Sequence, residues 1–398
     1  MLDKYRKAFN SDFKQETYQA LLNDVSQTFN YTPIFKIAET PIFISNDLKK
    51  RLINACHDIM SVINQPNFKT LTEGAFFDDK MKVPNEDDHS KFIQLDFGIC
   101  LDENGNPTPK LIELQGFPSL YCFQHFIGSM YRKHYNIPNH LSIHPTGITS
   151  KEFIETLRTE IVGDTNPKQV ILLEIEPDKQ ATAIDFYCTA ELLGVKVLCI
   201  SKLIKKGKKL FYKDDEGNDI QVLKIYNRII FDELDQRDDL KREFDFSDEV
   251  DVEWVGHPNW FFRISKYTMP LLKGDYVPKS YYLNQLESIP EDLENYVLKP
   301  LYSFAGAGVQ LHVTPDMIEN IANKSNYLLQ EKVAYHPIIE TLDVPAKCEI
   351  RMMLIHSKKD NTTKIVSNLA RLSKGEMIGV KYNKDKTWVG GSVCFFEL

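Results

Sequence analysis

Few features of this sequence point to disulfides, zinc or a membrane. Its seven cysteines are scattered, odd in number and without any C-x-x-C pair. Most of them stand in apolar runs, so we expect buried free thiols rather than disulfides or zinc ligands. No apolar run approaches the length of a membrane span, and the polar N-terminal stretch has no signal-peptide core. We therefore expect a soluble cytoplasmic protein with no membrane partner.

The sequence also lacks the short motifs of common nucleophilic and metal-dependent enzymes. It contains no G-x-S-x-G, H-E-x-x-H or Walker loop, and its histidines do not cluster. The formal net charge is -8 and there is no long basic run, which argues against a nucleic-acid partner. We find no combination of residues that predicts a nucleophilic mechanism.

The chain does have the composition of an ordinary globular protein. It contains 398 residues, of which 42% are hydrophobic and 26% charged, and this length favours two or three units around one active site. Periodicity and turn signals predict an α/β (α+β) fold. We expect four regions: a helical one at 1–90, a strand pair within 91–149, a βαβ unit at 150–250 and an α+β part at 251–398.

Several elements are well signalled. Apolar residues at helical spacing predict a helix at 46–64, capped by Ser45 or Asn46. Apolar runs predict strands at 92–100 and 109–114, joined by the turn DENGNP, and a second pair in EIRMMLI and KIVSNLARLS. VLKP and VQLHV, on either side of a glycine loop, predict a further β-hairpin.

One segment, YVLKPLYSFAGAGV, combines a strand, a lysine and a flexible loop. Lys299 ends an apolar run, and a buried lysine is costly unless it meets an anion. Gly306 and Gly308 let the backbone approach a ligand closely. Together these features suit the binding of nucleotide phosphates. An ordinary hairpin turn explains the segment equally well when it is taken alone.

Oxygen-bearing side chains stand on the first strand pair. Glu113 and Gln115 share a strand face because side chains alternate, and pairing across the turn would bring Asp96 beside them. Carboxylate and amide oxygens suit Mg²⁺, with water and phosphate completing its shell. The alternative is a pair of solvated carboxylates at strand ends. Ser119 follows in a turn, where its hydroxyl could contact a substrate.

Other candidates lie further along the chain. Lys266 begins an amphipathic pattern, and the alternative to a binding role is an ordinary surface lysine. Gln330 and Glu331 lie between two apolar stretches that could enclose an adenine ring. Arg351 and Arg371 lie inside apolar runs, where a guanidinium needs an anionic partner. For Arg228, a structural salt bridge and a substrate contact are equally plausible.

The order of these motifs resembles the ATP-grasp superfamily, and within it the circularly permuted branch that includes glutathionylspermidine synthase and related amide ligases. The resemblance covers roughly residues 92 to 398. It rests on Asp96 followed by ELQ and FPS, on KIYNRIIFDEL, on SKYTMPLL, on VLKPLYSFAGAGV, on the Gln330–Glu331 pair and on the late arginines.

The resemblance implies a Rossmann-like unit at 150–250, ATP-grasp lobes at 251–398, and ATP and Mg²⁺ as cofactors. It assigns the metal to Asp96, Glu113 and Gln115, and electrostatic or substrate contacts to Arg351, Arg371 and Ser119. The residues that it assigns to ATP are Lys266, Lys299, Gly306, Gly308, Gln330, Glu331 and the backbone near Val333.

Three departures from the family pattern bear on activity. Gln115 replaces an asparagine, Gln94 stands where the synthases carry an arginine, and the loop SFAGAG lacks the usual charged pair. The implied function is an ATP-dependent carboxylate–amine ligase that works through an acyl-phosphate, with small-molecule carboxylate and amine substrates. A phosphotransferase and a nucleotide-binding scaffold without turnover remain alternatives, and the sequence does not define the substrates or the oligomeric state.

Overall fold

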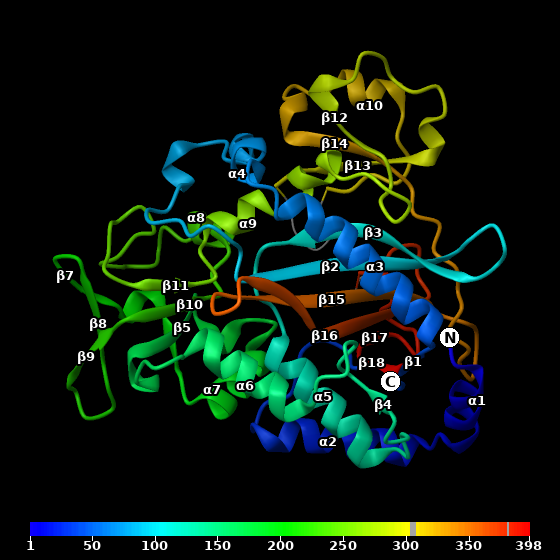
Figure 1. The fold of residues 1–398 in the computed structure, drawn as a ribbon, viewed down its shortest axis with the longest axis horizontal. Coiled ribbons are helices and arrows are strands. Elements are labelled where there is room, and N and C mark those ends of the chain that lie inside the picture. The colour runs from blue at the N-terminus through cyan, green and yellow to red at the C-terminus, as the bar shows by residue number, and fades with distance from the viewer. Residues whose placement is uncertain (303–307, 380–381) are drawn as a thin grey trace.

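A five-stranded antiparallel sheet forms the centre of the molecule (Figure 1). The computed structural model describes residues 1–302, 308–379 and 382–398. The strand order is β17-β16-β15-β2-β3, so strands from two distant parts of the chain lie side by side. The strands are β2 (Phe92–Leu101), β3 (Pro107–Gln115), β15 (Lys347–Ser357), β16 (Thr362–Ser373) and β17 (Gly390–Ser392).

Both predicted strand pairs are confirmed. β2 and β3 pair antiparallel, and so do β15 and β16. In the turn between β2 and β3, the Asp102 side chain accepts hydrogen bonds from the backbone N–H groups of Asn104 and Asn106. Gly105 adopts a φ of 77°, a conformation that a glycine reaches without strain.

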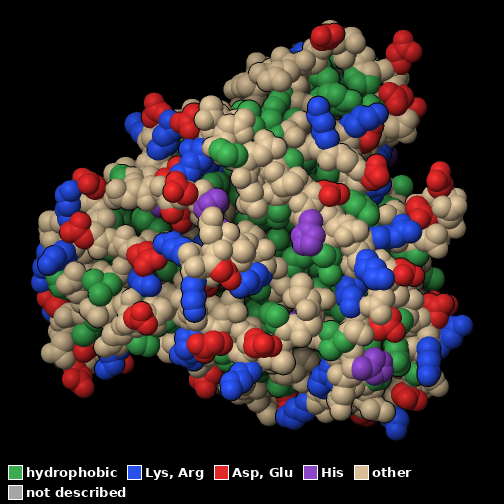
Figure 2. Space-filling view, in the orientation of Figure 1, with side chains coloured by type: hydrophobic (Ala, Val, Ile, Leu, Met, Phe, Trp, Pro, Cys, Tyr) green, Lys and Arg blue, Asp and Glu red, His purple; other side chains and the backbone are tan. Residues whose placement is uncertain are grey.

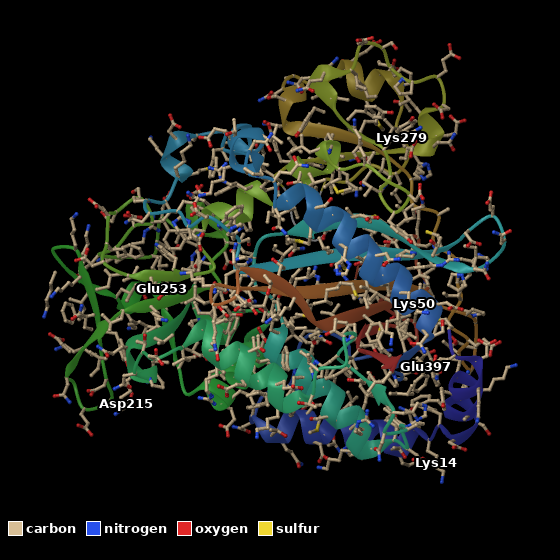
Figure 3. The ribbon with its side chains drawn as sticks, viewed as in Figure 1. Lys14, Lys50, Asp215, Glu253, Lys279 and Glu397 are labelled. Atoms are coloured by element: carbon tan, nitrogen blue, oxygen red, sulfur yellow. The ribbon has the colours of Figure 1, made fainter. Side chains whose placement is uncertain are left out.

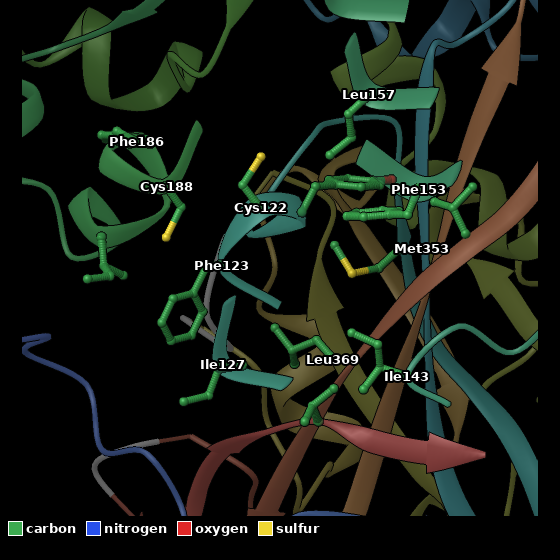
Figure 4. Packing of buried hydrophobic residues seen from close by; sticks show 14 of the residues in the cluster. Cys122, Phe123, Ile127, Ile143, Phe153, Leu157, Phe186, Cys188, Met353 and Leu369 are labelled. Atoms are coloured by element: carbon green, nitrogen blue, oxygen red, sulfur yellow. The ribbon is translucent and has the colours of Figure 1, made fainter. Parts of the chain in front are cut away.

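Helices cover the two faces of this sheet and bury its apolar side chains. The predicted helix is confirmed as α3 (Asn46–Ile63), whose apolar stripe packs on one face. The other face packs on α5 (Tyr121–His134), and α2 (Gln15–Thr28) contacts α5 in turn. Figure 4 shows this second cluster, in which Phe123 and Ile127 of α5 lie near Leu369 of β16. The sheet is therefore buried on both sides, which explains its continuous apolar runs.

The two ends of the chain meet in one small sheet. β1 (Ile42–Ile44) pairs parallel with β18 (Cys394–Glu397), and β18 also pairs with β4 (Leu141–Ser142). Neither Ser45 nor Asn46 caps α3 with its side chain. The cap comes from Glu397, whose carboxylate accepts a hydrogen bond from the Asn46 N–H at 3.2 Å (Figure 3). A carboxylate at a helix N-terminus also interacts favourably with the helix dipole.

The predicted βαβ unit is confirmed as a parallel sheet with the order β11-β10-β5-β6. Its helix ends at Gly194, which adopts a φ of 74°. The lysine-rich stretch that follows forms a separate antiparallel sheet of three strands. The strands and helices of this region are α6 (Ser150–Ile161), β5 (Val170–Glu174), α7 (Ala183–Leu193), β6 (Lys196–Cys199), β7 (Ile204–Lys206), β8 (Lys209–Lys213), β9 (Asp219–Val222), β10 (Lys224–Asn227), α8 (Phe231–Asp235) and β11 (Glu253–Val255).

A small lobe with its own apolar cluster lies beyond β3 (Figure 1). It contains β12 (Ser280–Tyr282), β13 (Tyr296–Pro300), α10 (Pro315–Glu319) and β14 (Tyr327–Glu331). Of the predicted hairpin between VLKP and VQLHV, the described residues show one antiparallel bridge, between Leu298 and Gln310, whereas β13 pairs along its whole length with β14. The remaining helices are α1 (Asp3–Asp12), α4 (Phe68–Leu71) and α9 (Asn259–Arg263), and 3-10 segments include η6 (Lys266–Leu271).

The expectation of buried free thiols is confirmed. All seven cysteines are free, and only Cys199 is partly exposed. On the face shown in Figure 2, lysines and arginines are interspersed with aspartates and glutamates. Within the described ranges, no helix combines the length and the apolar character needed to cross a bilayer.

Two neighbouring histidines, the partly buried His125 and the buried His144, each lower the stability of the folded state when the pH falls. His125 of α5 stacks on Phe153 and faces His144, and burial, aided by His144, lowers the pKa of His125 to about 4. Burial also lowers the pKa of His144. A group whose pKa is lower in the folded state costs stability as the pH falls from its unfolded value, about 6.5, towards its folded value.

We predict that His125→Phe, which keeps the ring, will change how the free energy of unfolding depends on pH. Between pH 7 and pH 5 the variant should fare better than the wild type by about 1–2 kcal/mol, because it has no proton to take up at this position. Urea unfolding at both pH values measures this, and an equal pH dependence in the variant and the wild type would contradict the role given to His125.

Candidate functional site

A cavity of about 180 Å³ opens where the central sheet, the parallel sheet and the segment before the small lobe meet. Glu113, Gln115 and Ser119 line it from the end of β3 and the following turn. Lys266 lines it from η6, and Tyr302 from the segment that follows β13. Four of the predicted site residues therefore share one cavity.

The opposite wall comes from the parallel sheet, at the carboxyl ends of β5 and β10. The chain leaves β5 towards β6 on one side and later returns to β10 on the other, and ligands of open α/β sheets bind at such a switch point. Glu174 is the last residue of β5, and Arg228 directly follows β10. Both side chains line the cavity, together with Gln180 and Glu233.

Glu174 was not identified from the sequence, where it reads as the end of an apolar strand. Burial raises the pKa of Glu174 to about 8, although an N–H donated by Ile175 and the charge of Arg228 oppose the shift. The side chain is therefore mostly protonated at neutral pH and can donate a hydrogen bond into the cavity.

Arg228 forms the salt bridge that was one of its two predicted roles. Its Nη1 donates to Asp185 at 3.0 Å, and both side chains are buried. The guanidinium also lies over the rings of Phe117 and Phe186. Its Nε is buried without a hydrogen-bond partner within the described part of the chain. One donor of a cavity-lining arginine is thus left over for a ligand.

The strands behind the cavity carry a buried cluster of charges centred on Asp96. Arg351 binds both carboxylate oxygens, with Nε at 2.5 Å and Nη2 at 2.7 Å, and Arg371 adds a third hydrogen bond at 2.6 Å. Burial opposes ionisation, but the two guanidiniums hold the pKa of Asp96 below its usual value. Strand register explains this meeting, because Asp96 pairs with Arg351 across β2 and β15.

Glu349 is a second carboxylate in this cluster that the sequence did not suggest. It lies opposite Arg371 across β15 and β16, forms an ion pair with it and accepts a hydrogen bond from the Tyr335 hydroxyl at 2.9 Å. Tyr335 packs so closely on β2 that a side chain at Gly98 would lie 2.7 Å from its ring. The signal for Glu349 was present in EIRMMLI, since it stands two residues before Arg351 on the same strand face.

The three predicted magnesium ligands lie close together on one face. Asp96 pairs with Glu113, and Gln115 donates a hydrogen bond to Glu113 at 3.3 Å. Glu113 and Gln115 line the cavity, whereas Asp96 is 1% exposed and both its oxygens are bound by arginines. No group of three or more His, Cys, Asp or Glu side chains suited to a metal occurs among the described residues. The magnesium site stays a prediction.

Lys299 is held at a β-bulge in the neighbouring strand. The register between β2 and β3 shifts beside Asp96, which leaves Ile112 without a partner in the ladder. Its carbonyl accepts a hydrogen bond from Lys299 Nζ at 3.1 Å. Burial lowers the pKa of Lys299 to about 8, which nearby Glu113 opposes and Lys266 reinforces.

The small-lobe sheet presents one face to the central sheet. Gln330 lies opposite Val297, and Lys299 lies opposite Leu328, so these four side chains share that face. Gln330 is 1% exposed, and neither its amide oxygen nor its amide nitrogen has a hydrogen-bond partner among the described residues. A buried polar group without a partner lowers the stability of the folded state by roughly 1–3 kcal/mol. A buried amide of this kind therefore indicates a ligand that supplies the missing hydrogen bonds.

The remaining predicted residues lie around this face. Glu331 points to the other side, where its carboxylate accepts the Lys279 N–H at 3.0 Å (Figure 3). Val333 follows β14 in an irregular segment. Gly308 adopts a φ of 71°, and a side chain there would lie 2.8 Å from Pro300, so only glycine fits. Gly306 lies outside the described residues.

Comparisons with known proteins identify the fold. No family model matches the chain, and no curated protein matches it. A solved structure that does match is a glutathione synthetase-like effector from Globodera pallida in its apo form. The TM-score is 0.59 over 96% of each chain, at 11% sequence identity. At this identity the match concerns the fold alone, and it shows that the chain has an α+β fold like that of the glutathione synthetase-like effector.

Proposed function

We propose that this chain is an ATP-dependent carboxylate–amine ligase with the element order of the circularly permuted ATP-grasp branch. The observation that carries the proposal is the pair formed by Lys299 and Gln330. Lys299, a buried cation bound to the Ile112 carbonyl, shares one face with Gln330, a buried amide without partners in the described structure. Glu113 of the central sheet lies near enough to Lys299 to affect its pKa. This combination suits a ligand that carries both phosphates and a heterocyclic base.

The donor set fits ATP. A glutamine amide can donate to and accept from one edge of adenine at the same time. Gln330 would do this, with backbone groups near Glu331 and Val333 beside it and Gly308 allowing close approach. Lys299 and Lys266 would bind the phosphates, where their charge offsets that of the anion. Glu113 and Gln115 offer oxygens that suit Mg²⁺, and Asp96 would join them on releasing an arginine. The metal would neutralise charge on the phosphates.

The cavity would hold the acid that is activated. Arg228 has an unused donor and Glu174 is mostly protonated, so both can bind a carboxylate or another acceptor on the substrate. Ser119 can add a hydroxyl. Arg371, whose side chain is 35% exposed, can stabilise charge that develops during transfer. Arg351 is bound to Asp96 and Gln94, so it acts through Asp96 rather than on the substrate.

The expected reaction has two steps. A carboxylate oxygen attacks the γ-phosphorus and ADP leaves, which gives an acyl-phosphate. An amine then attacks the acyl carbon, loses a proton and expels inorganic phosphate, which forms the amide. Partners are therefore a small-molecule carboxylate and an amine, with neither nucleic acid nor membrane required.

One observation favours a different outcome, a nucleotide-binding scaffold without turnover. Both oxygens of Asp96 are already bound by guanidiniums, and breaking a buried ion pair costs about 3–5 kcal/mol. If Asp96 stays bound to the arginines when nucleotide arrives, a magnesium ion has only Glu113 and Gln115 to bind.

Trapping with hydroxylamine separates these possibilities. We expect purified protein with Mg²⁺, ATP and a panel of amino acids and short γ-glutamyl peptides to release ADP and form a hydroxamate in equal amounts. Glu113→Gln should lower both rates roughly tenfold to a hundredfold if it weakens the metal. ADP without hydroxamate would indicate a phosphotransferase instead, and nucleotide binding without ADP release would indicate the scaffold.

The pKa of Lys299 predicts how nucleotide affinity changes with pH. The free protein loses the Lys299 proton as the pH rises through about 8, so a non-hydrolysable ATP analogue should bind several-fold more weakly at pH 9 than at pH 7. Lys299→Arg, which stays charged, should remove most of this change. The same pH dependence in the variant, measured by calorimetry, would show that Lys299 does not bind the phosphates.

A further inference from the structure

The turn between β3 and α5 contains a strained residue beside the cavity. Leu120 adopts a φ of 64° and a ψ of 20°, the left-handed region. For a residue other than glycine this conformation costs roughly 1–2 kcal/mol and persists only when its surroundings hold it in place. The preceding residue, Ser119, lines the cavity.

Both polar atoms of the peptide group that joins Ser119 to Leu120 are bound by buried side chains. The carbonyl oxygen of Ser119 accepts a hydrogen bond from Gln94 Nε2 at 2.7 Å. The N–H of Leu120 donates to Asp185 Oδ2 at 3.1 Å. Gln94 belongs to β2 of the central sheet, and Asp185 belongs to α7 of the parallel unit. One peptide group is therefore fixed from two separate parts of the fold.

Gln94 is itself fixed by the buried charge cluster. Its Oε1 accepts a hydrogen bond from Arg351 Nη1 at 2.7 Å, and Arg351 holds Asp96 with its other donors. An arginine can only donate and a carbonyl can only accept, so the amide has a single consistent orientation. A second arginine at position 94 could not accept a hydrogen bond from Arg351. The glutamine thus suits a cluster in which the guanidinium comes from β15.

Asp185 connects the same peptide group to the other wall of the cavity. Its carboxylate binds Arg228 at 3.0 Å and accepts the Phe123 N–H at 2.9 Å, at the start of α5. Asp185 is fully buried, so its charge depends on these donors. Displacement of the Leu120 N–H would disturb Arg228, and the reverse also holds.

We propose that Gln94 and Asp185 are positioning residues that hold the Ser119–Leu120 peptide group and couple the Asp96 cluster to Arg228. This inference rests on the proposed function for its catalytic meaning. The peptide group carries Ser119 at the cavity wall, and the hydrogen bonds on its two sides lead to the metal end and the acid end of the site. A ligand that moves one end would move the other.

Gln94→Glu tests the proposal with almost no change in shape. The glutamate keeps an acceptor for Arg351 but loses the donor to Ser119, and its second oxygen faces a carbonyl oxygen. Tyr131→Phe is the matched control, because the Tyr131 hydroxyl donates to the Ala38 carbonyl at 2.6 Å and ties α5 to a different segment of the chain.

Hydrogen exchange measures how firmly the Leu120 N–H is held, and it does not require an active enzyme. We expect the Leu120 N–H to exchange at least about tenfold faster in Gln94→Glu, at matched global stability, and to be unaffected in Tyr131→Phe. In the hydroxamate assay, Gln94→Glu should lower kcat while KM for ATP stays within about twofold.

Equal Leu120 exchange in Gln94→Glu and the wild type would overturn the proposal. An identical response in Tyr131→Phe would do the same, since it would reveal only a loosened α5. Lack of ADP release by the wild type would contradict the proposed function separately, and the exchange result would still decide whether this peptide group is held as described.

Discussion

The buried carboxylate of Asp96 is the interaction on which the rest of the site depends. A charge at this depth is tolerated only with partners, and Asp96 takes one guanidinium from β15 and another from β16. The two arginines lie 255 and 275 residues beyond Asp96 in the sequence, so the ion pairs help to specify which strands meet and in which register. The arginines, Glu349 and Gln94 all take their positions from this one side chain.

The charge cluster around Asp96 positions several of the residues in and around the cavity. The bulge beside Asp96 frees the Ile112 carbonyl for Lys299, and so connects the small lobe to the central sheet. Gln94 extends the cluster to the turn that carries Ser119. Through Asp185 the same turn meets Arg228 at the switch point of the parallel sheet. The central sheet and the parallel sheet therefore place polar groups around one cavity, and Lys299 joins the small lobe to the strand that lines it.

Sequence patterns predicted the parts of the fold that local rules determine. Long apolar runs identified β2, β15 and β16, and helical spacing identified α3, because burial on both faces or on one stripe leaves a clear period. The predicted hairpin after Lys299 is represented among the described residues by a single bridge. The main partner of β13 was missed, since it is β14 and turn signals carry no information about a strand almost thirty residues away. The α3 cap at Glu397 was missed for the same reason.

The same distinction between local and distant determinants applies to the residues of the candidate site. Charged side chains inside apolar runs stand out in a sequence, which is why Lys299, Asp96 and Arg351 were identified. Glu174, Glu349 and Asp185 acquire their roles only from neighbours that the fold supplies. Gln330 was noticed for its position in the chain, but only the structure shows that its buried amide has no partner among the described residues.

Calorimetric titration with a non-hydrolysable ATP analogue and Mg²⁺ tests the central claim most directly. The account predicts binding by the wild type and by Lys50→Met, a surface control on α3 (Figure 3). Lys299→Met and Gln330→Leu should each weaken binding by about tenfold or more, since each removes a buried contact to the nucleotide. Unchanged affinity in both variants, or no binding by the wild type, would contradict the assignment of this face to ATP.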